Sequence, residues 1–484
     1  MSVGQRVVAA VGWSTAIKVG FQIVTWVMTL LVIRILAPDD YGLMAISQVF
    51  INILLGFANF GLGDALVQRE DTPKSLVASV FGVLILVSTG LTIALALAAY
   101  PIAAWYHDSR LVALIQVSSL GFLFNGLTTV PRVFLTKSLR IRPMFVMELS
   151  SGLIASVTVI VLAYTGYGVW SLILGWLVGN VVRLIGFAVL TAEYFIWPSF
   201  DLRPVRPLLS YGLFRTLEYL AFFAVASADV LIIGRLLGPA ELGLYSVALN
   251  FAGMPLSKIA PNINAVAFPA FAMVQGQPGE ARFYAVKAMR LMATVCVPVF
   301  FGVAAIAPEI VSIVFGPKWL AAEPMLRVLA LAMSFRAILL VIPNYLQGIG
   351  DARAGFWCTA TGTIIFPPTF IVGCSWGIMG VCYAWLIGYP IVFVVNAWIA
   401  SRSGKLDLKA ILMTPLRPMA AGVAMLIAVW ALRPILVAGG YGAAAVVMLI
   451  VAGAATYGVV MALAFRALFL EVFALLRTRR SRAA

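Results

Sequence analysis

The chain is poor in charge and has almost no histidine. Charged residues make up 11% of its 484 positions, and histidine occurs once, whereas about 25% of a soluble domain is charged. Hydrophobic residues reach 63%. A soluble fold cannot bury that excess, because much of its surface must meet water. The shortage of charge therefore excludes an ordinary soluble protein and indicates that lipid is part of the solvent.

Metal ligands and reactive thiols are also scarce. The four cysteines, Cys296, Cys358, Cys374 and Cys382, lie in apolar runs and form no CxxC pair. Small packing residues are the expected role for such cysteines. The single histidine, His107, lies in a short predicted loop. We therefore expect no metal site, no cofactor and no catalytic residue.

Long hydrophilic segments are missing as well. No stretch between apolar runs is long enough to fold as a catalytic or nucleotide-binding domain, and no P-loop motif occurs. A membrane enzyme should show a long loop with clustered carboxylates or a separate cytoplasmic domain that binds its substrate. We therefore expect a protein that is not an enzyme.

Apolar runs of membrane-spanning length fill most of the sequence. A span needs about 20 apolar residues, and runs without polar alternation favour helices over a barrel. This predicts an all-α polytopic membrane protein with about 14 transmembrane helices, at residues 10–35, 41–66, 76–106, 111–131, 146–165, 169–192, 208–236, 241–272, 288–308, 321–348, 354–374, 376–400, 414–436 and 440–466.

Basic residues are distributed unevenly between the predicted loops. If the N-terminus lies inside, the inside segments hold most of the lysines and arginines, including those of the 132–142 loop and the C-terminal tail. Cytoplasmic loops carry such an excess, so both termini are expected in the cytoplasm. The net charge of +15 then reflects topology and no nucleic-acid partner is expected. The basic tail is expected to contact anionic lipid.

An internal repeat indicates how the helices are grouped. RILAPDDYGL (34–43) aligns with RLLGPAELGL (235–244) at a constant offset, and each copy joins the first two spans of a six-span set. This predicts two six-helix lobes, 1–195 and 205–400, in a parallel repeat, followed by two extra helices (410–466) and a basic cytoplasmic tail (467–484). The identical pairs are Arg34/Arg235, Leu36/Leu237, Pro38/Pro239, Gly42/Gly243 and Leu43/Leu244.

Polar side chains recur at helical spacing in the leading spans of both predicted lobes. Charged groups are costly at membrane depth and usually face a bundle interior or a wet cavity. We therefore expect a polar, mainly cationic cavity between the lobes. Its predicted substrate-binding residues are Lys18, Gln22, Asn52, Arg215, Lys258 and Arg336.

Two carboxylates on the seventh predicted span are candidates for ion coupling. Asp229 is the first and Glu218 the second. A carboxylate in a low dielectric favours its neutral form, and such a group can carry a proton or hold a sodium ion. Structural alternatives remain open: Glu218 can pair with Arg215, Asp229 with Arg235, and Lys18 can reach the headgroups from its helix end.

Several segments resemble the Wzx-type flippases of the polysaccharide transport family, within the multidrug/oligosaccharidyl-lipid/polysaccharide (MOP) exporter superfamily. The segments are GWS (12–14), NFGLGDALVQRED (59–71), VLIIGRLLGPAELGLYSVALN (230–250), FPAFAMVQ (268–275) and VFGPKW (314–319). The colanic-acid and exopolysaccharide subgroup is the most similar. The resemblance implies a V of two six-helix lobes with two peripheral helices. It also implies that Lys18 lies where related flippases meet a diphosphate, and that Asp229 matches an acidic position before the IGR-x-LG motif.

The resemblance and the cationic balance together favour one function. The expected protein is a flippase that moves an undecaprenyl-diphosphate-linked oligosaccharide repeat unit across the inner membrane, by ion-coupled alternating access, for exopolysaccharide or O-antigen/capsule assembly. The expected partners are this lipid-linked glycan, membrane lipid and the polysaccharide polymerase machinery. The alternative is a multidrug/cation antiporter of the same superfamily, which should have an acidic, aromatic cavity instead.

Overall fold

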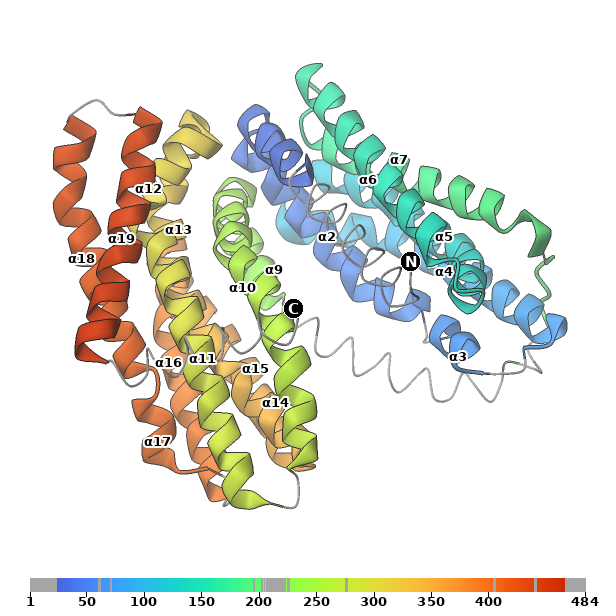
Figure 1. The fold of residues 1–484 in the computed structure, drawn as a ribbon. Coiled ribbons are helices and arrows are strands. Elements are labelled where there is room, and N and C mark those ends of the chain that lie inside the picture. The colour runs from blue at the N-terminus through green and yellow to red at the C-terminus, as the bar shows by residue number, and fades with distance from the viewer. Residues whose placement is uncertain are drawn as a thin grey trace, which may run out of the picture. The chain divides into compact units, whose positions relative to one another are not determined.

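The fold consists of helices throughout the part of the chain that can be described. The computed structural model describes residues 24–59, 62–69, 72–194, 196–201, 203, 205, 223, 227–274, 277–403, 406–438 and 442–465. No strand occurs among them, which confirms the all-helical class (Figure 1). The chain divides into two compact units, unit 1 (Met1–Gly243) and unit 2 (Leu244–Ala484), and each unit is described by itself.

Many of the helices have the length and composition of membrane spans. Within the described residues, 10 helices are long and apolar enough to cross a bilayer, so the protein is a multi-pass membrane protein. They correspond to ten of the predicted runs. Two further runs coincide with α2 (Pro38–Asn59) and α10 (Pro239–Met273), helices of 22 and 35 residues. The remaining two, 10–35 and 208–236, fall largely outside the described residues, and the count of 14 stays a prediction.

Unit 1 is a bundle organised around α5. In Figure 1, α4, α5, α6 and α7 run alongside one another: α4 packs along α5, α6 along α7, and α5 joins the two pairs by packing on α7. Helix α2 packs on α5, α7 and α9. The described elements of unit 1 are the helix Val24–Ile35, α2, α3 (Leu62–Gln68), α4 (Lys74–Tyr106), α5 (Arg110–Lys137), α6 (Ile141–Tyr164), α7 (Val169–Leu190), the 3-10 turn η1 (Ala192–Tyr194), α9 (Ala228–Leu236) and the start of α10.

The turn between α4 and α5 is fastened to α2 by one arginine. His107 ends α4 in the left-handed conformation, with φ 56°, and donates its backbone N–H to carbonyls of the last turn. Arg110 then pairs with Asp108 at 2.7 Å and with Asp39, in the first turn of α2, at 2.5 Å. Hydrogen bonding to Arg110 lowers the pKa of the Asp108 carboxyl from its usual value.

The two copies of the repeated motif contact each other reciprocally. A Cβ added to Gly42 would lie 1.7 Å from the carbonyl oxygen of Pro239, and one added to Gly243 would lie 1.7 Å from that of Pro38. Pro239 and Gly243 are the repeat partners of Pro38 and Gly42. All four residues belong to unit 1. The motif therefore needs glycine because a backbone carbonyl occupies the place of a side chain.

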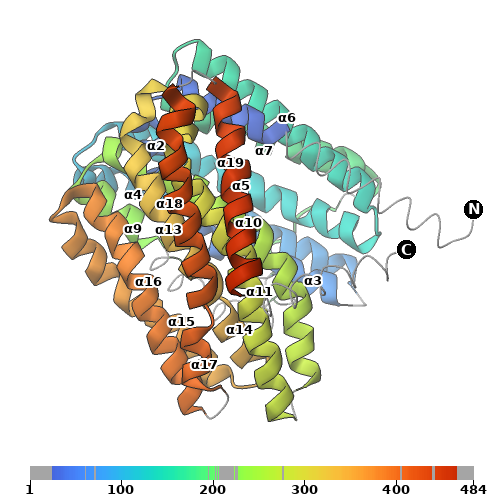
Figure 2. The same cartoon turned by 60° about the vertical axis from the view of Figure 1, so that its left-hand side comes forward.

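Unit 2 is a second bundle, with the last two helices packed on its side. Helix α15 packs along α16, α13 lies between α11 and α16, and α18 contacts both α11 and α19. Figure 2 shows α18 and α19 side by side. The described elements are the rest of α10, α11 (Pro278–Ala305), α12 (Ala307–Glu309), the π-helix η2 (Ile310–Phe315), the 3-10 helix η3 (Pro317–Ala322), α13 (Glu323–Leu339), α14 (Val341–Gly348), α15 (Ala352–Cys374), α16 (Gly377–Arg402), α17 (Leu408–Met413), α18 (Leu416–Ala438) and α19 (Gly442–Ala464).

Charged contacts hold α18 to the rest of unit 2. Arg433 of α18 forms a 2.8 Å ion pair with Glu309, whose side chain is only 9% exposed. Arg327 of α13 lies over the ring of Trp430, 5.2 Å from its centroid. Helix α18 is thus fixed to the rest of unit 2. The predicted divisions at 195, 205, 400 and 410 stay a prediction.

Candidate functional site: a cationic cavity in unit 1

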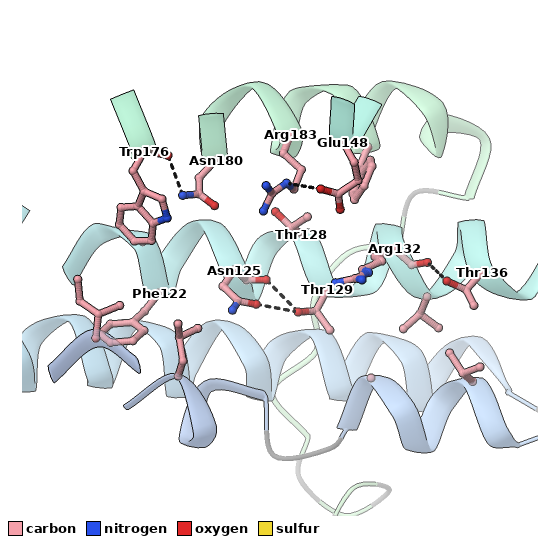
Figure 3. Close-up of a pocket in the computed structure, with 17 residues that line it drawn as sticks. Phe122, Asn125, Thr128, Thr129, Arg132, Thr136, Glu148, Trp176, Asn180 and Arg183 are labelled. Carbon is pink, nitrogen blue, oxygen red and sulfur yellow. Dashed lines mark hydrogen bonds and ion pairs between the residues drawn. The ribbon is translucent and has the colours of Figure 1, made fainter. Parts of the chain in front are cut away.

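A cavity of about 610 Å³ lies inside unit 1 between α2, α3, α5, α6 and α7. Its volume falls within the range of small-molecule sites, about 300–1,000 Å³. Figure 3 shows that polar side chains from α5 and α7 face each other across it. No residue of the predicted substrate and ion sets is among those that line this cavity, so the site could not be anticipated from the sequence.

Helix α5 supplies a continuous polar stripe. Asn125, Thr128, Thr129, Arg132 and Thr136 all line the cavity. Their spacing of i, i+3, i+4, i+7 and i+11 places them on one helical face. The stripe thus carries amide, hydroxyl and guanidinium groups along one wall (Figure 3).

The threonine hydroxyls of this stripe are oriented by their own helix. Thr129 Oγ1 donates to the carbonyl oxygen of Asn125 at 2.9 Å, and Thr136 Oγ1 to that of Arg132 at 2.9 Å. Thr128 bonds to Phe124 in the same way. Because a hydroxyl has one donor and two acceptor lone pairs, these groups offer oxygen acceptors to the cavity.

Helix α7 builds the facing wall. Trp176, Asn180 and Arg183 recur at i, i+4 and i+7 and line the cavity. Asn180 donates its side-chain N–H to the Trp176 carbonyl oxygen at 2.9 Å. The indole of Trp176 reaches α5 only because position 121 is glycine: a Cβ there would lie 2.1 Å from the ring atom Cη2.

An ion pair joins α7 to α6 at the wall of the cavity. Arg183 Nε lies 3.1 Å from Glu148 Oε2, and the two side chains are 36% and 32% exposed. The Nε atom itself is buried, and no acceptor among the described residues meets hydrogen-bond geometry with it. The pair is therefore held by charge without an aligned hydrogen bond.

The second arginine of the cavity is not neutralised. Arg132 is exposed, and no carboxylate of the described residues forms an ion pair with it. The lining carries two arginines and one glutamate, a surplus of one positive charge. Guanidinium groups present planar arrays of donors that suit phosphate oxygens. The cavity is therefore suited to a ligand that combines an anion with hydroxyl groups.

The two predicted site residues of unit 1 that the structure describes, Asn52 and Asp229, do not line this cavity. Asn52 of α2 accepts a hydrogen bond from Gln48 Nε2 at 3.4 Å. Asp229, in the first turn of α9, is buried, with 4% exposure. The ion pair that Asp229 could have formed with Arg235 is not seen, and the Arg235 guanidinium lies instead over the Trp105 ring, 5.4 Å from the centroid.

The other predicted residues belong to unit 2 or cannot be placed. Lys258 of α10 and Arg336 of α13 are exposed, and Arg336 Nη1 lies 3.9 Å from the sulfur of Met333. Four residues, Lys18, Gln22, Arg215 and Glu218, lie outside the described residues. The convergence of the predicted set on one site, and the role of each member, stay a prediction.

Comparison with known proteins identifies relatives along nearly the whole chain. The succinoglycan biosynthesis transport protein ExoT of Rhizobium meliloti (strain 1021) is 27% identical over 482 residues, covering 98% of this chain and 96% of the relative. The lipopolysaccharide biosynthesis protein WzxC of Escherichia coli (strain K12) is 25% identical, with 82% and 80% covered. The teichuronic acid biosynthesis protein TuaB of Bacillus subtilis (strain 168) is 25% identical, with 78% of each chain covered.

Solved structures show the same fold. The lipid II flippase MurJ, in an inward closed conformation, matches with a TM-score of 0.70 at 15% identity, over 93% of this chain and 98% of that one. An inward-facing multidrug resistance MATE family transporter of the MOP superfamily matches with a TM-score of 0.59 at 15% identity, over 80% and 95%. At these identities the likeness concerns the fold alone.

A family model that matches the sequence shows the family to which the chain belongs. The model of a family described as polysaccharide biosynthesis protein matches residues 31–324, more than half of the chain. This range includes the repeated motif in both copies and all the helices that form the cavity. The chain therefore belongs to this polysaccharide biosynthesis protein family, and the resemblance to Wzx-type proteins that its motifs predict is confirmed.

Proposed function

We propose that the protein flips an undecaprenyl-diphosphate-linked oligosaccharide repeat unit from the cytoplasmic to the periplasmic leaflet of the bacterial inner membrane. The product supplies the assembly of an exopolysaccharide, O-antigen or capsule. The observation that carries the proposal is the cavity of unit 1, where two arginines lie among amides, hydroxyls and an indole. Its occurrence in a family of polysaccharide biosynthesis proteins supports a glycan substrate.

Each part of such a substrate has a matching surface in this cavity. Arg132 and Arg183 would hold the diphosphate through charge-assisted hydrogen bonds. The amides of Asn125 and Asn180 would bond to sugar hydroxyls, and Trp176 offers an apolar ring face beside them. The prenyl chain would remain in the bilayer, whose hydrocarbon is its natural solvent.

The position of the charged groups supports loading from the cytoplasm. Arg132 lies near the end of α5, Glu148 near the start of α6 and Arg183 near the end of α7. The charge bias of the 132–142 loop assigns these helix ends to the cytoplasmic side. A headgroup made inside the cell would therefore meet the guanidinium groups first.

Transport would proceed by alternating access between two six-helix lobes within about 14 spans. The repeated motif and its reciprocal contact support this symmetry. In this mechanism Asp229, with Glu218 as second candidate, would couple the cycle to an ion gradient, and the polysaccharide polymerase machinery would receive the product.

A multidrug or cation antiporter is less compatible with the cavity. An organic cation would meet two guanidinium groups against a single carboxylate, and like charges in a partly desolvated site repel. The fold shared with MATE transporters does not by itself favour their substrates.

The proposal is tested by flipping of the lipid-linked glycan in proteoliposomes. Arg132→Ala should reduce the initial rate about ten- to hundredfold at limiting substrate, because a hydrogen bond to a charged group contributes about 1.5–3 kcal/mol. Arg140→Ala is the matched control: Arg140 pairs with Glu193 at 2.6 Å and does not line the cavity. A wild-type rate in folded Arg132→Ala and Arg183→Ala would refute the proposed site.

A further inference from the structure

The Glu148–Arg183 pair is loosely engaged. The ion pair joins Nε to Oε2 at 3.1 Å, but the buried Nε has no aligned acceptor among the described residues. Guanidinium has five N–H donors, and a bidentate carboxylate would use two of them in parallel. Arg183 therefore retains donor capacity on the side of the cavity.

The two arginines of the cavity are in different states. Arg132 has no carboxylate partner among the described residues, whereas Arg183 is held by Glu148. Both line the same cavity, with Thr128 of α5 between them in Figure 3. A single anionic group would meet Arg132 at once, but a ligand with two linked phosphates would also reach Arg183 and compete there with Glu148.

We propose that Glu148 is a built-in competitor for the anion site, which a diphosphate displaces from Arg183 on binding and which regains Arg183 when the diphosphate leaves. This inference rests on the proposed function and adds a role for one residue of the same site. Without Glu148 two uncompensated guanidinium groups would hold a diphosphate and slow its release. Glu148 thus lowers affinity and raises turnover.

Removing the charge of Glu148 should change diphosphate binding and glycan transport in opposite directions. Glu148→Gln keeps the shape of the side chain but removes its charge, so a diphosphate should bind more tightly, by about two- to fivefold, the range of partly exposed ion pairs. At saturating substrate the same variant should flip the glycan more slowly by a similar factor, because release is slower. Loss of a purely structural contact would weaken binding and transport together.

The experiment measures binding of farnesyl diphosphate to the purified full-length protein in nanodiscs, with farnesol as the blank. Arg132→Ala and Arg183→Ala should each weaken binding about ten- to hundredfold. Glu148→Gln should tighten it in the wild-type background. In the Arg183→Ala background the carboxylate acts on the diphosphate by repulsion alone, so the effect of Glu148→Gln should differ in size there. This double-mutant cycle isolates the pair.

Glu193→Gln is the matched control. It removes the same charge in the same unit, from a carboxylate that pairs with Arg140 and does not line the cavity, so it should leave binding at the wild-type level. Equal tightening by Glu193→Gln would show that the effect arises from net charge alone, and would overturn the proposal. Weaker binding in folded Glu148→Gln would also overturn it, with Glu148 then a positioning residue for Arg183. Unchanged binding in both arginine variants would instead remove the anion site itself.

Discussion

The role of a charged residue depends on whether it lies in a loop or on a helix, as Arg132 shows. In the sequence it belongs to a basic segment after an apolar run, where cytoplasmic loops are expected. In the structure α5 continues to Lys137, and Arg132 becomes the charged member of a stripe that lines a cavity. The helical spacing of the polar residues from Asn125 to Thr136 is visible in the sequence. The predicted span, however, ends at residue 131 and therefore leaves Arg132 outside the helix.

The ion pair of the cavity could not be predicted from the sequence. Glu148 and Arg183 lie on different helices, and their meeting depends on α6 packing along α7. A single helical stripe cannot reveal such a pair, because periodicity reports one face of one element. Glu148 is the one carboxylate of α6, and the positions four and seven residues after it are Gly152 and Ala155, so it belongs to no polar stripe that the sequence could reveal.

Asp229 remains the candidate for ion coupling. It is buried, and Arg235 lies over the Trp105 ring. We expect Asp229→Asn to leave protein folded and substrate bound, but to abolish the dependence of flipping on an imposed ion gradient. Flipping in proteoliposomes with and without the gradient measures this. Gradient-driven flipping at the wild-type rate would exclude the coupling role.

Lys258 provides a second test among the residues predicted from sequence. It is exposed on α10, the helix that starts within the second copy of the repeated motif. If its ammonium meets an anionic substrate, Lys258→Ala should lower glycan export about tenfold or more while protein stays in the membrane. Lys258→Arg should retain export. Normal export from the alanine variant would assign Lys258 to a role in the headgroup region.

At the scale of elements, the positions of most spans followed from length and apolarity alone. The predicted runs 76–106 and 169–192 correspond to α4 (Lys74–Tyr106) and α7 (Val169–Leu190). The run 321–348 corresponds to one candidate span, as predicted, and its helix is interrupted at Leu340, between α13 and α14. Pro343 lacks the N–H that would bond to the carbonyl of Leu339. A hydropathy profile does not detect the loss of this backbone hydrogen bond.

The repeated glycines should not tolerate even a methyl group. Gly243→Ala would place a carbon 1.7 Å from the Pro38 carbonyl oxygen, and backbone cannot yield cheaply. We expect a loss of about 1–3 kcal/mol in unfolding free energy, seen as a lower Tm in detergent. Gly253→Ala in the same helix is the control, because nothing lies within 4 Å of its Cβ position. It should be neutral or stabilising. Equal Tm values for the two variants would contradict the close contact.

The Arg110 cluster should make stability depend on acid in a defined window. The folded pKa of Asp108 is lowered, first by its hydrogen bond with Arg110, so its contribution is present above the unfolded pKa, about 3.9. It is lost as the pH falls through the folded pKa. The Tm difference between wild type and Arg110→Gln should therefore be constant from about pH 8 to about pH 5 and shrink below about pH 4. A difference that grows on acidification would contradict this assignment.

At the scale of the molecule, orientation in the membrane can be tested with single cysteines. All four native cysteines are buried, so an introduced thiol at an exposed site would dominate labelling. Arg140→Cys, within the 132–142 loop, should react with an impermeant maleimide only in permeabilised cells, because both termini and this loop are expected in the cytoplasm. Lys318→Cys should react in intact cells. Labelling of residue 140 in intact cells would reverse the topology.

The reciprocal contact between the motif copies carries a consequence for the origin of the chain. Where residue i of one copy touches residue j of the other, residue j of the first also touches residue i of the second: Gly42 meets Pro239, and Gly243 meets Pro38. That is the signature of an isologous interface, which forms when two identical subunits associate about a two-fold axis. A fold that arose by fusion of two copies of a half-length chain would keep such a contact inside one polypeptide. In a homodimer one substitution would alter both contacts at once, whereas in this chain Gly42 and Gly243 can be substituted separately.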